Sequence, residues 1–189
     1  MSDNQLKIIG GQWRGRKLSF HPLPNLRPTG NRIRETLFNW LSPSISRARC
    51  LDVFAGSGIL SFEALSRGAG EVWALEYDAR QVTQLLAQKS TFKAQQLKVQ
   101  QVDSFKFLQN NQDSRQFDIV FLDPPYSFNA LSWCFEHLEK QAWLAQNALI
   151  YIEADTRSLV WPDDWQILKH KQAGGVHYGL LSNQKPLKP

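Results

Sequence analysis

The sequence predicts an α/β fold in which a mostly parallel sheet has helices on both faces and ends in an antiparallel hairpin. Between residues 50 and 152, short apolar runs alternate with segments of helical periodicity. Repeated strand–helix units of this kind form parallel sheets with right-handed crossovers. After residue 160, two apolar runs flank Gly174-Gly175, which is typical of a hairpin that adds antiparallel strands at one edge.

The first quarter of the chain predicts a small extension made of a β-hairpin and a helix. Residues 7–20 are expected to form two short strands around a glycine-containing turn, and three prolines interrupt the stretch that follows. A helix is then expected to run to Leu41, because apolar residues recur there at helical spacing. Either Thr29 or Asn31 is expected to cap this helix, and Ser42-Pro43 ends it.

The rest of the chain predicts seven strands and four helices. The apolar runs predict strands at 51–54, 71–75, 97–102, 117–122, 148–152, 165–171 and 176–181. The helical patterns predict helices at 58–67, 79–93, 104–110 and 130–140. Gly68 ends the first of these helices, and Ser104 is expected to cap the third. We therefore expect a basic N-terminal extension at 1–49, one domain at 50–183 and a loose tail at 184–189.

The composition favours a cytoplasmic globular protein. Hydrophobic residues make up 42% of the 189 residues, which is enough for a substantial core. No apolar run reaches 18 residues and the N-terminus is polar, so we expect neither a membrane span nor a secretory signal. Cys50 and Cys134 lack metal-ligand spacing, which predicts buried free thiols in a reducing compartment and no metal ion. No long apolar seam suggests a dimer, so we expect a monomer.

The positive charge is concentrated at the N-terminus. Residues 1–49 hold nine basic and two acidic side chains, whereas the remainder holds 13 basic and 15 acidic ones. A local basic patch beside a nearly neutral domain indicates a polyanionic partner such as nucleic acid, although a solvated basic surface would give the same pattern. The candidates for phosphate contacts are Arg14, Arg16, Lys17, Arg27, Arg32 and Arg34. Arg32 and Arg34 have an alternative, which is to pair within their helix or to close over a cofactor.

The segment Asp123-Pro124-Pro125-Tyr126 follows a buried strand and is the most informative motif in the chain. Its two prolines fix φ and remove two amide donors, so the loop is stiff and offers hydrogen-bond acceptors. Acceptors beside an aromatic ring suit a planar group with N–H donors, such as the exocyclic amine of a nucleobase. The segment therefore predicts a base-binding catalytic loop, and a purely structural turn is the alternative.

Polar and glycine-rich loops follow three other predicted strands. The first strand leads into Asp52 and the loop Ala55-Gly56-Ser57-Gly58, where glycine lets the backbone approach a ligand. Ser61 replaces the third glycine of a dinucleotide fingerprint, and Asp52 suits a cationic ligand. Glu76 follows the second strand, where an acid can hold the ribose of NAD or of S-adenosylmethionine.

After the third strand, Asp103 and Ser104 are placed to contact an adenine ring, and helix capping is the alternative role for them. All of these loops follow strand C-termini, and that edge forms the ligand crevice in an open α/β sheet.

Together these loops resemble the Rossmann-like class I S-adenosylmethionine-dependent methyltransferases. The segments 10–18, 26–29 and 32–39 resemble, more narrowly, the RsmD family of bacterial 16S ribosomal RNA guanine-N2 methyltransferases. The resemblance covers residues 7–181, and it departs at Asn31, where the family pattern has Asp. It implies methylation of one guanine N2 amine, position 966 in the family's rRNA numbering, on assembled or assembling 30S subunits.

The resemblance also implies roles for the loops. S-adenosylmethionine would lie over 55–58 with its ribose on Glu76, its amino acid part near Asp52 and its adenine near Asp103-Ser104. The target guanine would leave its stack and lie against Tyr126, with its N–H groups held by Asp123 and the Pro124 carbonyl. No metal ion is needed for this reaction.

Three other functions stay open at this point. An adenine-N6 methyltransferase on DNA or RNA would use the same Asp123-Pro124-Pro125-Tyr126 loop. An NAD(P)-linked oxidoreductase would share the fold, and a non-catalytic RNA-binding protein would keep the fold and the basic patch. The choice of guanine over adenine, and of RNA over DNA, rests on the resemblance of the N-terminal segments.

Overall fold

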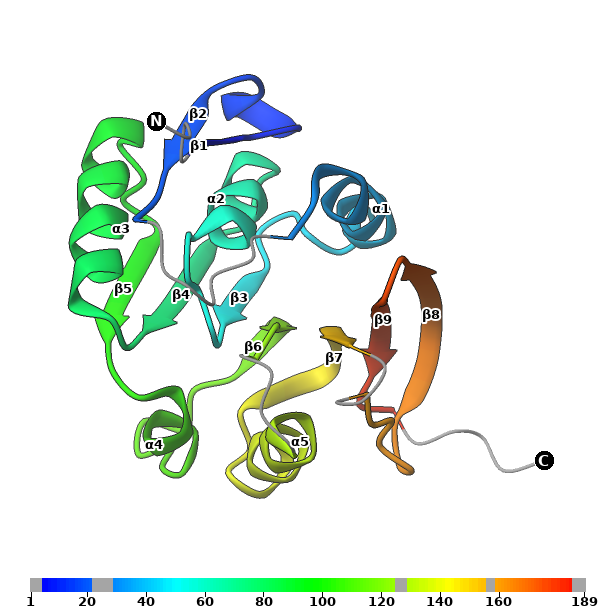
Figure 1. Cartoon of the computed structure of the whole chain (residues 1–189). Coiled ribbons are helices and arrows are strands. Elements are labelled where there is room, and N and C mark those ends of the chain that lie inside the picture. The colour runs from blue at the N-terminus through cyan, green and yellow to red at the C-terminus, as the bar shows by residue number, and fades with distance from the viewer. Residues whose placement is uncertain (1–4, 22–28, 125–128, 156–158, 185–189) are drawn as a thin grey trace.

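The computed structural model describes residues 5–21, 29–124, 129–155 and 159–184 (Figure 1). Its strands are β1 (Gln5–Lys7), β2 (Lys17–Ser19), β3 (Arg49–Asp52), β4 (Glu71–Glu76), β5 (Leu97–Gln101), β6 (Phe117–Leu122), β7 (Leu144–Asp155), β8 (Gln166–Ala173) and β9 (Val176–Ser182). Its helices are η1 (Gly11–Trp13, a 3-10 turn), α1 (Asn31–Leu41), α2 (Ile59–Ser66), α3 (Ala79–Phe92), α4 (Ser104–Leu108) and α5 (Ala130–Lys140).

The large sheet has seven strands in the order β5-β4-β3-β6-β7-β9-β8, which confirms the predicted sheet. Pairing is parallel from β5 through β7, and β9 runs antiparallel to both β7 and β8. After β3 the chain forms β4 and β5 on one side of β3, and it then forms β6 on the other side of β3. The carboxyl ends of β3 and β6 therefore meet at a topological switch point, where open α/β sheets bind ligands.

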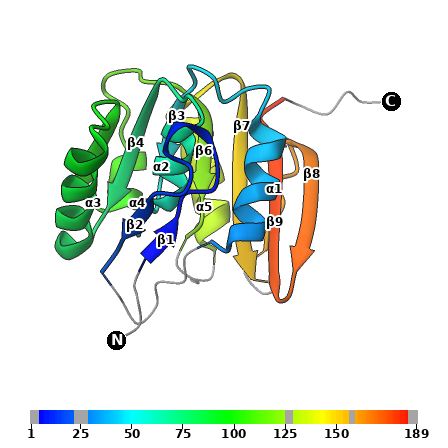
Figure 2. The same ribbon diagram turned by 90° about the horizontal axis from the view of Figure 1, so that it is seen from above.

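Helices cover both faces of this sheet, as predicted. Helices α1, α2 and α3 lie on one face, and α4 and α5 lie on the other (Figure 1). The view from above shows the small β1–β2 hairpin lying outside α2 (Figure 2). Each face has its own apolar cluster, one containing Phe38 of α1 and Phe62 of α2, the other containing Cys134 and Leu138 of α5.

The N-terminal segment belongs to the same core as the sheet. Trp13 is 9% exposed and packs its ring against Phe62 and Phe92, with ring centroids 6.2 and 5.3 Å away. The Ser66 hydroxyl ties the segment to the end of α2, since it donates to the Gly10 carbonyl at 2.6 Å and accepts from the Trp13 amide at 2.9 Å. The division of the chain at residue 49 stays a prediction.

Gly11 is expected to be essential to this attachment. Its φ is +73°, and a Cβ there would lie 1.8 Å from the Ser66 carbonyl oxygen. Gly11→Ala therefore adds a backbone clash to the strain of a left-handed φ. The matched control is Gly15→Ala, where φ is +87° but the nearest atom to a Cβ, Lys7 Cε, is 3.8 Å away. In urea unfolding we expect about 1 kcal/mol of loss for Gly15→Ala and clearly more for Gly11→Ala; equal losses would contradict the attachment.

Three predicted details of local structure are wrong. Helix α1 is capped by Gly30, with no side-chain cap, instead of Thr29 or Asn31. The strand expected at 51–54 is shifted to Arg49–Asp52, because pairing with β4 and β6 ends at Asp52. Helix α4 is capped by Asp103 and not by Ser104, because the Asp103 carboxylate accepts from the amides of Phe105 and Lys106.

Both cysteines are free and buried, as predicted. Burial raises the pKa of the Cys134 thiol to about 12 and raises that of Cys50 further. In the part of the chain that the structure describes, no helix is long and apolar enough to cross a membrane.

Candidate active site

The predicted site residues lie at the carboxyl edge of the parallel strands. Asp52 is the last residue of β3, Glu76 is the last residue of β4, and Asp123 comes directly after β6. Because β3 lies between β4 and β6, the fold gathers these three carboxylates around the switch point. The order of the strands, and not proximity in sequence, thus brings these three residues to one place.

The glycine loop is held against the end of β4. The Gly56 amide donates to Glu76 Oε2 at 2.8 Å, and the Asp78 amide donates to Glu76 Oε1 at 2.7 Å. Gly56 and Gly58 have φ of +50° and +76°, and a Cβ on Gly58 would lie 2.3 Å from Leu85 Cδ2. Burial raises the pKa of Glu76, and the amide bonds oppose that shift. The loop therefore needs glycine both for its turn and for its close packing on α3.

Asp52 is a buried carboxylate at the beginning of the glycine loop. It is 3% exposed and accepts a 2.7 Å hydrogen bond from the Ser61 hydroxyl in α2. Burial raises the pKa of Asp52 to about 7, and the Ser61 bond only partly opposes the rise. Ser61 thus has a defined role at the position where a dinucleotide site has glycine. A buried acid beside the helix start disfavours a pyrophosphate and favours a cationic group.

The free energy of unfolding is expected to depend on pH through Asp52. Because its folded pKa of about 7 exceeds the unfolded value of about 3.9, the folded state binds the proton more tightly. This stabilisation is complete below the unfolded pKa and is lost as pH rises toward and through 7, with a slope of at most about 1.4 kcal/mol per pH unit. Asp52→Asn should flatten the decline in urea unfolding between pH 5.5 and 8. An unchanged slope would contradict the burial of this acid.

Asp123 lies among groups contributed by three elements. Thr29, just before α1, directs its hydroxyl toward Asp123 Oδ2 at 3.5 Å. Burial raises the pKa of Asp123, and the neighbouring carboxylates of Glu153 and Asp52 raise it further. Pro124 follows Asp123, and Pro125 and Tyr126 lie outside the described residues. Asp123 therefore lies at the edge of the sheet beside two other acidic side chains, which disfavour its ionisation.

The chain is similar to known proteins over nearly its whole length. Residues 6–182 match the family model described as "Conserved hypothetical protein 95". The chain is 46% identical to "Ribosomal RNA small subunit methyltransferase D" of Haemophilus influenzae, over 95% of this chain and 94% of that protein. The Escherichia coli K12 protein of the same name is 44% identical, over 95% and 91% of the two chains. A solved structure, "Putative methyltransferase yhhF from Escherichia coli", has a TM-score of 0.85 at 44% identity, covering 96% and 99%.

The chain belongs to the RsmD family. The Rossmann-like fold expected from the sequence is confirmed by the sheet order and by these structural relatives.

In this RsmD chain, Ser104 has a structural role that the sequence did not predict. Its buried hydroxyl donates to the Val53 carbonyl, which joins the start of α4 to the end of β3. Asp103 uses its carboxylate to cap α4. Contact of these two residues with an adenine ring stays a prediction.

The prediction that Arg34 binds RNA phosphates is wrong. Its side chain is fully buried and pairs with Glu63 Oε1 at 3.1 Å, while Glu63 is itself fully buried. Its guanidinium also donates to the carbonyls of Lys7 and Thr29 and to Asn31 Oδ1, at 2.5–3.1 Å. Arg34 thus joins β1, the start of α1 and α2. Asn31, where the RsmD pattern has Asp, is an acceptor in this network.

Four of the other five basic candidates, Arg14, Arg16, Lys17 and Arg32, are exposed. Arg16 donates to the Thr91 carbonyl at 3.0 Å and its guanidinium lies 3.8 Å from the Phe92 ring centroid, at the end of α3 opposite to Glu76. Arg32 is exposed in the first turn of α1, nearer the edge. Arg27 lies outside the described residues.

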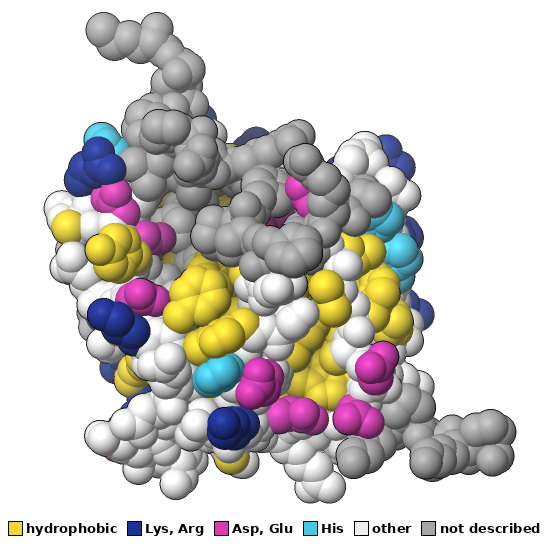
Figure 3. Space-filling model, turned by 60° about the horizontal axis from the view of Figure 1, so that its bottom comes forward, with side chains coloured by type: hydrophobic (Ala, Val, Ile, Leu, Met, Phe, Trp, Pro, Cys, Tyr) yellow, Lys and Arg dark blue, Asp and Glu magenta, His cyan; other side chains and the backbone are white. Residues whose placement is uncertain are grey.

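Several aromatic side chains lie near this edge of the RsmD fold, and of these the sequence predicts only that Phe105 contacts an adenine ring. Tyr77 follows Glu76 and is 76% exposed. Phe54, Phe105 and Trp133 form a half-buried row, with neighbouring ring centroids 5.7 and 5.0 Å apart. Figure 3 shows hydrophobic side chains gathered on this side of the molecule, among acidic ones. The alternation of apolar and polar residues within one strand cannot predict this row of aromatic rings, because the three rings come from different elements.

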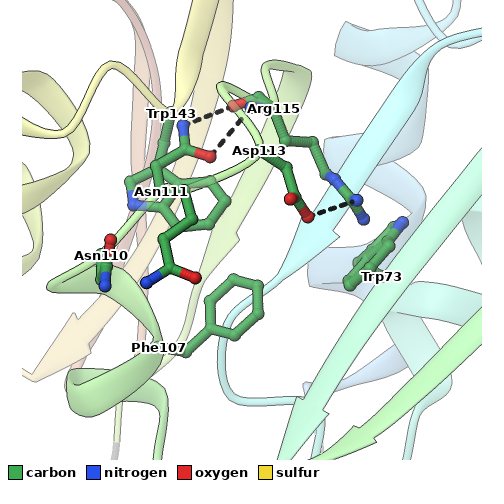
Figure 4. A pocket seen from close by; sticks show the side chains of 8 residues that line it. Trp73, Phe107, Asn110, Asn111, Asp113, Arg115 and Trp143 are labelled. Carbon is green, nitrogen blue, oxygen red and sulfur yellow. Dashed lines mark hydrogen bonds and ion pairs between the residues drawn. The ribbon is translucent and has the colours of Figure 1, made fainter.

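A separate pocket lies away from the strand edge. It encloses about 200 Å³ and is lined by Trp73, Phe107, Asn110, Asn111, Gln112, Asp113, Arg115 and Trp143 (Figure 4). Arg115 lies 3.8 Å above the Trp73 ring and pairs with Asp113 at 3.1 Å. None of the predicted site residues lines it. Within the described residues, no group of three or more His, Cys, Asp or Glu side chains is arranged to hold a metal ion.

Proposed function

We propose that this protein transfers a methyl group from S-adenosylmethionine to the exocyclic N2 amine of a guanine in 16S ribosomal RNA. The observation that carries the proposal is the meeting of Asp123 with the Asp52 glycine loop at the switch point of the sheet. The curated relatives named as small subunit rRNA methyltransferases support the same substrate. By the family's rRNA numbering the target is guanine 966.

The residues present fit S-adenosylmethionine. Glu76, held by two amides at the end of β4, offers carboxylate oxygens to ribose hydroxyls. Asp52 supplies negative charge for the cationic amino acid part, and the glycine loop allows close backbone approach. Tyr77 and Asp103-Ser104 border the expected adenine position. The cofactor would supply an electrophilic methyl group on a sulfonium, which becomes a neutral thioether on transfer.

The protein's own part in the reaction is to position the amine. A guanine amine is a poor nucleophile because its lone pair is delocalised into the ring. Asp123 and the Pro124 carbonyl would accept its N–H bonds and turn the lone pair toward the methyl group. Tyr126 would stack on the flipped base. The methylated nitrogen then loses a proton to Asp123 or to water, so Asp123 acts mainly by orientation and by stabilising the positive charge that develops.

Ser61 favours this cofactor over a dinucleotide. Its hydroxyl is hydrogen-bonded to Asp52, so an acidic side chain lies where a dinucleotide site would receive a pyrophosphate at the start of α2. A thermal-shift series should show stabilisation by S-adenosylmethionine and S-adenosylhomocysteine and none by NADH or NADPH. Stabilisation by a dinucleotide alone would overturn the proposed cofactor.

The proposed RNA surface consists of the basic side chains Arg14, Arg16, Lys17, Arg27 and Arg32, and all of these except Arg27, which lies outside the described residues, are exposed. The basic loop, residues 14–17, lies near the C-terminal ends of α2 and α3, whereas Asp52 and Glu76 lie near the N-terminal ends of these helices. The helices are 8 and 14 residues long, so the loop is roughly 12–20 Å from these carboxylates. RNA that reaches both would run along the face formed by α2 and α3. A monomer acting on an assembled or assembling 30S subunit is the form that we propose.

Charge reversal of Arg14 and Lys17 is expected to weaken binding to small subunits and to leave cofactor affinity unchanged. A plot of log affinity against log salt concentration falls with increasing salt, and each phosphate contact that is lost should make this fall shallower by about 1 in slope. The matched control is Lys140→Glu, since Lys140 is exposed on α5 at the opposite face. A filter-binding titration over several salt concentrations measures both variants. If the control and the double variant weaken binding equally, the basic loop is not the RNA surface.

Methyl transfer from labelled S-adenosylmethionine to 30S subunits of a strain that lacks the modification tests the proposed function. Label should enter 16S RNA in about one equivalent per subunit. A parallel reaction on naked 16S RNA separates the assembled from the free substrate. No transfer to either substrate would contradict the proposal.

A further inference from the structure

Glu153 of β7 is placed next to Asp123 by the register of the sheet. Leu122 of β6 and Ile152 of β7 are paired neighbours, and each is followed directly by one of the two acids. Parallel strands lie about 4.8 Å apart, so Asp123, just after β6, and Glu153, within β7, lie side by side. They also point to the same face, because Phe121 pairs with Tyr151 two residues earlier in each strand.

This position is buried and polar. Glu153 is 8% exposed, and its Oε2 accepts a 2.9 Å hydrogen bond from the Tyr151 hydroxyl. A carboxylate has about four acceptor sites on its two oxygens, so it can serve several donors at once. The charge of Glu153 is close enough to Asp123 to raise its pKa, second only to burial. Two neighbouring buried carboxylates favour a ligand with hydrogen-bond donors on two adjacent atoms.

Guanine has such an edge, whereas adenine does not. The Watson–Crick edge of guanine carries the N1–H donor next to the N2 amine, and that of adenine carries the N6 amine next to the N1 acceptor. A carboxylate accepts N1–H of guanine, and it repels the lone pair on N1 of adenine. An acid next to the amine-holding Asp123 therefore selects guanine.

We propose that Glu153 is the specificity-determining residue that accepts the N1–H of the target guanine while Asp123 holds its N2 amine. This inference rests on the proposed function and assigns base selection to a residue outside the Asp123-Pro124-Pro125-Tyr126 loop. Tyr151 then acts as a positioning residue, since its hydroxyl fixes the Glu153 carboxylate.

The test uses 2-aminopurine, which keeps the N2 amine of guanine but has an acceptor at N1. Small subunits are reconstituted with 16S RNA carrying guanine, 2-aminopurine or inosine at the target position, and inosine lacks the N2 amine. Wild-type protein should methylate 2-aminopurine at least about 100-fold more slowly than guanine, because a site built to bind a donor rejects an analogue without it. Equal wild-type rates on the two bases would overturn the inference without any variant.

Glu153→Gln supplies the second measurement. Its amide can still accept from Tyr151 and can donate to N1 of 2-aminopurine, so the guanine to 2-aminopurine rate ratio should fall by about 10-fold or more. The matched control is Glu136→Gln, an exposed acid on α5, which should keep the wild-type ratio. An unchanged ratio in folded Glu153→Gln protein, judged by its affinity for S-adenosylhomocysteine, would contradict the inference. Failure of the wild type on guanine itself would instead contradict the proposed function.

Discussion

Replacing Asp123 with alanine is expected to lower the rate of methyl transfer by about 100- to 1000-fold, the loss typical when a group that stabilises developing charge is removed. The side chain follows β6 and faces the groups of three other elements, including Thr29 and Glu153. Its removal takes away the acceptor that orients the amine. Cofactor binding should persist, because Asp52 and Glu76 are untouched. Single-turnover transfer and calorimetric binding of S-adenosylhomocysteine measure the two effects separately.

Asp118→Asn is the matched control for that variant. Asp118 lies on the same strand, but its carboxylate pairs with Arg49 at the surface, 3.2 Å away. It should transfer methyl groups at the wild-type rate. Asp123→Ala protein that keeps both its fold and its full transfer rate would show that another group orients the amine.

Replacing Arg34 with methionine is expected to destabilise the protein by about 3–5 kcal/mol, because it leaves a buried charge without its main partner. Among the residues that the structure describes, Glu63 would keep the Arg67 contact at 3.2 Å and the hydrogen bond from the Ile9 amide at 2.5 Å. The carbonyls of Lys7 and Thr29 would also lose their donor. Urea unfolding followed by tryptophan fluorescence gives the free energy of unfolding for wild type and variant.

Arg49→Met is the control for the ion pair. The Arg49–Asp118 pair has side chains 51% and 40% exposed, and surface pairs contribute about 0–1 kcal/mol. If Arg34→Met and Arg49→Met lower the free energy of unfolding by the same amount, the hydrogen bonds of Arg34 do not join the N-terminal segment to α2. Since Arg34 also bonds the Thr29 carbonyl, its loss should lower activity of the folded variant as well.

The fold could largely be predicted from the sequence because apolar residues recur at a different spacing in strands and in helices. The predicted segments 117–122 and 130–140 agree with β6 and α5 to the residue. The order of strands could not be read from single segments, because it depends on which faces the crossovers bury. Strand β7 is longer than the 148–152 segment predicted for it. Leu144 pairs with Phe117 of β6, and residues 153–155 pair with β9, but Gln146, Asn147, Glu153 and Asp155 interrupt the apolar pattern at the two ends.

The site was predictable where one motif follows one strand and was missed where partners come from several elements. The location of Asp52, Glu76 and Asp123 at one edge was predictable because each of them ends or follows an apolar run. Arg34 was misjudged because an arginine in an amphipathic helix normally faces solvent, and only the position of Glu63 in α2 makes its burial possible. Glu153 was missed because it continues an apolar run whose neighbour, β6, is distant in sequence.

The identity of the methylated nucleoside decides whether this protein modifies guanine or adenine. After transfer from labelled S-adenosylmethionine to 30S subunits, the 16S RNA is digested to nucleosides and separated by chromatography with mass detection. We expect label in N2-methylguanosine alone, from one position of the RNA. Label in N6-methyladenosine would contradict this expectation.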